Sequence, residues 1–106
     1  MTKTETICRL NDAFRSSFMG GRLLVTPGIA DRADANAILE KVRSFNQFSE
    51  DNDPYGEHDF GALDWDAQKV FWKIDYYDAD LSGGSPDPSD PAVTTRVLTV
   101  MLAEEY

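Results

Sequence analysis

Residues 58 to 77 have the pattern of a β-hairpin, and no other part of the chain restricts the fold as strongly. Two runs rich in aromatic and β-branched residues, from about His58 to Trp65 and from Gln68 to Tyr77, favour two strands. Asp66 and Ala67 separate these runs and predict a two-residue turn. A hairpin of this kind has to bury one of its faces against further elements of the same domain.

A two-residue turn also fixes which residues face each other across the hairpin. Gly61 then faces Trp72, and the missing side chain leaves room for the indole ring. The other pairs are Leu63 with Val70, Asp64 with Lys69, Ala62 with Phe71, Phe60 with Lys73, and His58 with Asp75. We therefore expect Trp72 in the core, and Asp75 and Tyr77 on the opposite face of the sheet.

Two helices and one strand are predicted before the hairpin. An apolar stripe over residues 5 to 18 predicts the first helix, with Thr4 as its cap and Gly20-Gly21 as its stop. The apolar run over residues 22 to 26 predicts a short buried strand. A second apolar stripe over residues 34 to 48 predicts the second helix.

The last predicted element is a third helix. Asp90 and Pro91 are residue types typical of an N-cap and a first helical position. The apolar residues that follow at helical spacing are Val93, Val97, Leu98, Met101 and Leu102. The predicted order is α-β-α-β-β-α, an α+β fold. A small, largely antiparallel sheet, formed by the hairpin and one further strand, would pack with three helices in a single domain of residues 1 to 106.

The net charge of the chain is strongly negative and unevenly distributed. The 106 residues include 19 acidic and 10 basic ones, for a formal charge of −9 at pH 7. The charge is +2 over residues 1 to 49, −10 over residues 50 to 90 and −1 over residues 91 to 106. A chain with this charge repels nucleic-acid phosphates and anionic membrane surfaces, so we expect it to bind neither directly.

The sequence also lacks the features of a membrane-spanning, secreted or cysteine-rich protein. No run approaches the roughly 18 apolar residues that a membrane-spanning helix needs, and the first residues lack the apolar stretch of a signal peptide. We therefore expect a soluble cytoplasmic protein. Cys8 is the single cysteine, so it cannot close a disulfide within the chain or build a cysteine-rich metal site.

The segment from Asp51 to Asp59 matches part of a calcium-binding loop, with Asp at positions one, three and nine and Gly at position six. Tyr55 at position five and Ala62 at position twelve break the pattern. We therefore expect no bound metal and no cofactor, and interpret the segment as a polar turn before a strand.

His58 is the only histidine, so chemistry that needs a proton carrier near neutral pH would have to use it. The alternative function is therefore an enzyme or a metal-dependent module centred on His58, Asp75 and the Asp51–Asp59 loop. We expect instead a structural His58 that hydrogen-bonds Asp75 or the preceding loop, and we assign no catalytic residue.

Protein binding is the function that the sequence favours. Tyrosines beside carboxylates can bind Arg and Lys through hydrogen bonds, charge and ring contacts. The candidate partner-binding residues are Glu50, Asp51, Asp53, Tyr55, Glu57, Asp59, Asp75, Tyr77, Asp78 and Asp80. The expected partner is a basic protein surface, such as that of a nucleic-acid-binding effector. The alternative is a solvated acidic surface that serves only solubility.

Four stretches of the chain resemble a family of small bacterial proteins classed as a domain of unknown function. They are Leu10–Arg15, Glu50–Gly61, Phe71–Asp78 and Thr94–Thr99. The resemblance implies no activity, fold or catalytic residue, and the family tends to have Gly in the hairpin turn where this chain has Ala67.

Members of such families often travel on plasmids, phages and genomic islands. This suggests an anti-defence inhibitor, such as an anti-CRISPR or anti-restriction protein, that acts as a nucleic-acid mimic by placing carboxylates where phosphates would lie.

Overall fold

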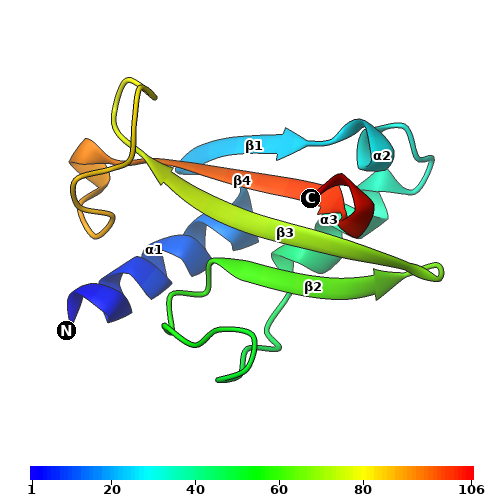
Figure 1. The fold of residues 1–106 in the computed structure, drawn as a ribbon, viewed down its shortest axis with the longest axis horizontal. Helices are drawn as coiled ribbons and strands as arrows, with labels where there is room; N and C mark the ends of the chain where they lie inside the picture. The colour runs from blue at the N-terminus through cyan, green and yellow to red at the C-terminus, as the bar shows by residue number, and fades with distance from the viewer.

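The computed structural model describes residues 1–106 and has an α+β fold (Figure 1). Its helices are α1 (Lys3–Ser17), α2 (Pro27–Ala30) and α3 (Ala35–Arg43), and its strands are β1 (Gly21–Val25), β2 (Phe60–Trp65), β3 (Gln68–Tyr77) and β4 (Thr95–Leu102). Two short 3-10 turns, η1 (Pro91–Val93) and η2 (Ala103–Glu105), flank β4. The four strands form one sheet in the order β1-β4-β3-β2.

The sheet is mixed, which corrects the prediction of a largely antiparallel sheet. β2 pairs antiparallel with β3, and β3 pairs antiparallel with β4, but β1 runs parallel to β4. The sheet also has one strand more than predicted, because residues 95–102 form the strand β4 instead of a third helix. The predicted element order α-β-α-β-β-α was therefore wrong at its last position, and it also lacked the short helix α2 that follows β1.

The sequence around β4 explains this error. The Asp90 carboxylate accepts a hydrogen bond from the Ala92 N–H at 2.9 Å, as an N-cap does, but the helical segment ends after the single turn η1. The residues that follow are rich in Thr and Val, whose branched side chains favour a strand. Leu98 and Val97 are both buried although they point to opposite faces of the sheet. A strand that is apolar on both faces can imitate the apolar stripe of a helix.

The ends of the other helices also differ from the prediction. Thr2 caps α1 in place of Thr4, and a capping box joins it to Glu5 through hydrogen bonds of 3.1 and 3.2 Å. The helix ends at Phe18, which has a left-handed φ of 59°, before the two glycines. α3 stops at Arg43, so that Phe48 reaches the core from the following loop.

The hairpin has the predicted register. Gly61 faces Trp72 and Leu63 faces Val70, and Asp66 and Ala67 form the turn with φ values of 49° and 64°. Positive φ at both central residues is the geometry of a type I′ turn, whose twist suits a hairpin. The predicted hairpin is confirmed for the pairs from Phe60 with Lys73 to the turn.

The core lies between one face of the sheet and the helices. Phe14 of α1 and Val42 of α3 pack there with Trp72 of β3 and Val100 of β4. No α-helix covers the opposite face of the sheet, and the short turn η2 lies at its side (Figure 1). No helix in the structure is long and apolar enough to cross a membrane.

Candidate functional site

The uncovered face of the sheet forms a shallow hollow of about 660 Å³. Strand residues alternate between the two faces, so this face receives every second side chain of β1, β3 and β4. The residues that line the hollow are Arg22, Leu24, Thr26, Lys73, Asp75, Tyr77, Leu81, Val97, Thr99, Met101, Glu105 and Tyr106. Asp75 and Tyr77 therefore lie on the face predicted from the hairpin register.

Large apolar and aromatic side chains remain accessible on this face. Leu24 is 54% exposed and Tyr77 is 37% exposed. Tyr106 is 74% exposed and meets the rings of Phe60 and Phe71 edge to face, at centroid distances of 6.4 and 5.8 Å. Accessible aromatic surface beside polar groups is typical of a binding surface.

Three of the four charged side chains that line the hollow, those of Lys73, Asp75 and Glu105, already have polar partners. The fourth, Arg22, forms no ion pair. Lys73 Nζ lies 2.9 Å from Asp75 Oδ2, and this hydrogen bond raises the pKa of Lys73. The Glu105 carboxylate accepts hydrogen bonds from Thr26 Oγ1 at 2.7 Å and from the Gly28 and Leu102 N–H groups at 2.9 Å, which lowers its pKa. These contacts fix η2 beside the hollow.

Four carboxylates, those of Asp53, Glu57, Asp59 and Asp75, lie near one another at the end of the sheet where β2 begins. The pKa of Asp59 is raised, first because the side chain is half-buried and then because Glu57, Asp53 and Asp75 repel its charge. None of the ion pairs in the structure includes Asp59. This end of the molecule therefore combines high negative charge density with accessible aromatic surface.

The ten predicted partner-binding residues do not form one surface. Glu50, Asp51 and Tyr55 are exposed in the loop before β2, and Tyr77, Asp78 and Asp80 lie at the end of β3 or just after it. Asp78 also shapes its own loop, because it accepts hydrogen bonds from the Ser82 N–H at 2.8 Å and the Gly83 N–H at 3.3 Å.

Two members of the predicted set point into the molecule instead. The Asp53 side chain is only 6% exposed and faces His58. Glu57 accepts a 2.7 Å hydrogen bond from the hydroxyl of Tyr76, and burial together with this bond raises the pKa of Tyr76. Both acids therefore belong to an internal network of polar contacts.

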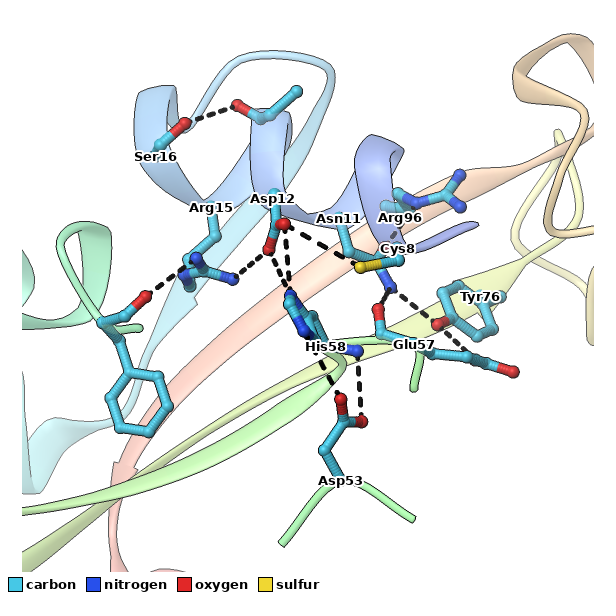
Figure 2. A network of polar contacts seen from close by, with 12 residues as sticks. Cys8, Asn11, Asp12, Arg15, Ser16, Asp53, Glu57, His58, Tyr76 and Arg96 are labelled. Atoms are coloured by element: carbon cyan, nitrogen blue, oxygen red, sulfur yellow. Dashed lines mark hydrogen bonds and ion pairs between the residues drawn. The ribbon is translucent and has the colours of Figure 1, made fainter. Parts of the chain in front are cut away.

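His58 lies at the centre of this network (Figure 2). Its Nδ1 is 2.9 and 3.1 Å from the two carboxylate oxygens of Asp12, and its Nε2 is 3.6 Å from Asp53 Oδ2. The imidazole stacks on Phe48 with a centroid distance of 3.7 Å and an interplanar angle of 4°. The expected contact with the preceding loop is present, since Asp53 also accepts from the His58 N–H at 3.2 Å.

The expected pairing of His58 with Asp75 is wrong. His58 has a left-handed φ of 55°, and β2 begins only at Phe60, so the hairpin register does not extend back to the histidine. Asp75 pairs with Lys73 on the uncovered face instead. The catalytic arrangement of His58, Asp75 and the Asp51–Asp59 loop is therefore not formed.

A polar stripe on α1 supplies the other half of the network. Cys8, Asn11, Asp12 and Arg15 are three or four residues apart, so they share one side of the helix. Asn11 is fully buried and donates to the Glu57 carbonyl at 2.9 Å and to the Tyr76 hydroxyl at 2.8 Å. Arg96 Nε donates to Asn11 Oδ1 at 2.7 Å.

Arg15 is buried between aromatic rings and fixes Asp12. Its guanidinium carbon lies 5.0 Å from the ring centroid of Trp72 and 5.3 Å from that of Phe48. Its Nη2 donates to the Phe45 carbonyl at 3.0 Å, and its Nη1 donates to Asp12 Oδ1 at 3.1 Å. The carboxylate of Asp12 is thus held in position toward His58.

Cys8 completes the cluster at the surface of α1. Its Sγ donates to Asp12 Oδ2 at 3.8 Å. Burial raises the pKa of this thiol to about 11, and the charges of Asp12 and Asp53 contribute to the shift. The cysteine is therefore a protonated thiol at neutral pH and lacks the depressed pKa of a catalytic nucleophile.

The contribution of α1 to this cluster was not predicted from the sequence. Asp12 and His58 are separated by 46 positions, and no local pattern connects them. The available signal was the presence of Asn11 and Arg15 on the inward side of an amphipathic helix, where both are buried. Buried polar side chains require partners, so they indicated that a polar segment packs against this helix.

A family model described as a protein of unknown function (DUF3768) matches residues 25–105. Three of the four stretches that suggested a family resemblance lie within this match, whereas the stretch on α1 precedes it. No curated protein and no solved structure matches the chain. Because the match covers more than half of its residues, the chain belongs to the DUF3768 family.

Proposed function

We propose that the protein is a small interaction module that binds a Lys- and Arg-rich protein surface. The observation that carries this proposal is the uncovered sheet face, whose accessible tyrosines lie beside an end of the sheet rich in carboxylates. We call this surface, defined by Leu24, Asp75, Tyr77 and Tyr106 together with the neighbouring carboxylate of Asp59 just before β2, the acidic face.

A basic side chain suits the acidic face in two ways. The aliphatic stem of Lys or Arg can cover apolar surface such as Leu24 and Tyr77 while its charged head meets a carboxylate. A cation beside Asp59 would also offset the repulsion among Asp59, Glu57 and Asp53. The charge of −10 over residues 50 to 90 would accelerate the encounter with such a partner.

The more specific form of the proposal is an inhibitor that occupies the nucleic-acid-binding groove of its partner. Carboxylates of the acidic face would lie where phosphates otherwise bind, as in an anti-CRISPR or anti-restriction protein. We expect such an encounter in the cytoplasm. This form predicts that DNA or RNA competes with the protein for the partner, whereas a basic surface outside the groove would bind both together.

The proposal can be tested with a fluorescently labelled arginine-rich peptide, whose binding is followed by fluorescence anisotropy. One triple variant neutralises carboxylates of the acidic end: Asp51→Asn, Asp59→Asn and Asp75→Asn. A matched control neutralises exposed carboxylates elsewhere: Asp31→Asn, Asp64→Asn and Glu104→Gln. Each variant removes three negative charges from the formal total of −9, so both have a charge of −6.

We expect the first variant to lose about tenfold or more in affinity and the control to lose about two- to threefold, because close charge pairs contribute more than distant ones. Equal losses in both variants would show that only the net charge acts. The negative segment would then be a feature of solubility, and the proposal would fail.

A further inference from the structure

Three different kinds of metal-binding atom meet beside α1. The Sγ of Cys8, a carboxylate oxygen of Asp12 and a ring nitrogen of His58 all lie within 4.8 Å of one another (Figure 2). Cys8 and Asp12 are one helical turn apart on α1, and the loop before β2 brings His58 to them. This cluster takes no part in the proposed binding of a basic partner.

The spacing of these atoms is close to that of a tetrahedral zinc site. Zinc bond lengths of about 2.0 to 2.3 Å give distances of about 3.3 to 3.8 Å between neighbouring ligand atoms. Asp12 Oδ2 lies 3.1 Å from His58 Nδ1 and 3.8 Å from Cys8 Sγ. Small movements of the side chains would bring the three atoms around one ion.

The surroundings already orient the Asp12 carboxylate for this role. Arg15 Nη1 holds Oδ1 at 3.1 Å, and Oδ2 is the oxygen directed toward the thiol. One oxygen is thus fixed by an outer hydrogen bond and the other is available to a metal ion. Ligating carboxylates in metal sites are commonly held in this way.

The second ring nitrogen of His58 has a suitable partner as well. Nε2 faces Asp53 Oδ2 at 3.6 Å, and the Asp53 side chain is nearly buried. A histidine that binds a metal through one nitrogen usually donates its other N–H to a carboxylate. Phe48 stacks on the imidazole at 3.7 Å and restricts its rotation.

We propose that Cys8, Asp12 and His58 form a binding site for a zinc-type divalent transition-metal ion, with Asp53 as the outer partner of His58. Sulfur and nitrogen ligands favour zinc over calcium or magnesium, which prefer oxygen ligands alone. Three protein ligands leave a fourth position of the tetrahedron for water, and the site is open to solvent because the His58 side chain is 26% exposed.

Binding of the metal ion would leave the site without net charge and would release one proton. The thiolate of Cys8 and the carboxylate of Asp12 together neutralise the two positive charges of the ion. The thiol proton passes to solvent, and the ring proton of His58 resides on Nε2 so that Nδ1 can bind the metal. The ion would fasten α1 to the loop before β2.

The test is a zinc titration of the full chain after treatment with a chelator, measured by competition with a chromophoric zinc indicator. Cys8→Ala removes the sulfur at a site on the helix where Ala is well tolerated. His58→Asn removes the ring and keeps a residue that accepts a left-handed φ. Asp51→Asn, in the same loop but exposed, is the matched control. Urea unfolding without metal verifies that each variant is folded.

We expect one zinc ion per chain with a dissociation constant of about 1 μM or lower, and an increase in Tm with added zinc. Cys8→Ala and His58→Asn should each weaken binding by about tenfold or more, whereas Asp51→Asn should leave it unchanged. Cobalt(II) should produce a thiolate-to-metal absorption band that Cys8→Ala abolishes. A parent chain that binds zinc no more tightly than Cys8→Ala, or a cobalt complex without the thiolate band, would overturn the proposal.

Discussion

Trp72 connects the hairpin to the network around His58. Its side chain is fully buried, its ring meets Phe45 and Phe48 edge to face at 5.5 and 6.1 Å, and the Arg15 guanidinium lies over it. Phe48 in turn stacks on His58. A change at the indole should therefore affect the stability of the core and the position of the histidine together.

Gly61 provides the space that Trp72 occupies. A Cβ atom at position 61 would overlap the indole, whereas one at Gly84 would meet nothing within 4 Å. Gly61→Val should lower the free energy of unfolding by about 1 to 3 kcal/mol through overpacking. Urea denaturation measures the effect, with Gly84→Val as the control. Equal stability of Gly61→Val and the parent chain would argue against this packing.

Asp59 should make the stability of the protein depend on pH. Its pKa is raised in the folded state, so the folded chain binds more protons than the unfolded chain between the ordinary carboxyl pKa, about 4, and the raised value. The contribution of Asp59 to stability therefore falls as pH rises through this window.

Replacing Asp59 with Asn removes this penalty. We expect Asp59→Asn to be more stable than the parent chain at pH 7, and the difference to disappear as the pH falls below about 4. Urea denaturation of both proteins across this range measures the difference. A variant that is less stable than the parent at pH 7 would contradict the account of Asp59.

At the scale of the elements, local patterns predicted the hairpin and failed for β4. The turn and the facing pairs of β2 and β3 lie within 20 residues, so the two-residue turn and the alternation of side chains together determine their register. Val97, Leu98, Met101 and Leu102 fit a helical stripe as well as a strand that is apolar on both faces. The strand is formed by pairing with β1 on one side, which is distant in sequence, and with β3 on the other.

The candidate functional site, like the fold, could be predicted from the sequence only in part. The alternation of β3 placed Asp75 and Tyr77 on the face without helices. The approach of His58 to Cys8 and Asp12 depends on a left-handed residue after a long loop, and single-sequence patterns do not predict such a contact.

Ala67 is an unfavourable residue for its place in the hairpin turn. Its φ of 64° is costly for a residue with a Cβ and natural for glycine. Ala67→Gly should raise the free energy of unfolding by about 0.5 to 1 kcal/mol. This value is the gain from relieving the backbone strain, reduced by the cost of ordering glycine, which has more conformational entropy than alanine in the unfolded chain. Thermal or urea unfolding measures this change. Ala62→Gly, in the strand β2, should have the opposite sign, and a loss of stability in both variants would contradict the turn geometry.

Over the whole molecule, helices cover one face of the sheet and negative charge gathers at one end. Helices α1 and α3 bury the core-facing side chains, while the acidic face stays accessible. The acidic residues between 50 and 90 leave this region with a charge of −10. Shape and charge together therefore favour a basic partner on the acidic face.

Binding to a basic partner should weaken as salt is added. The affinity for an arginine-rich peptide should fall by about tenfold or more between about 50 mM and 500 mM NaCl, because salt screens exposed charges beyond about 8 to 10 Å. Fluorescence anisotropy at several salt concentrations measures this dependence. An affinity that does not change over this range would show that charge does not control the association.

The most direct test of the acidic face is to locate a bound basic peptide by NMR. The measurement is a titration of the ¹⁵N-labelled protein with an arginine-rich peptide, followed through the backbone amide signals. We expect the largest changes at Leu24, at Asp59 and in the segment from Lys73 to Tyr77. Changes spread evenly over all exposed acidic residues, or concentrated at the hairpin turn around Asp66, would contradict this expectation.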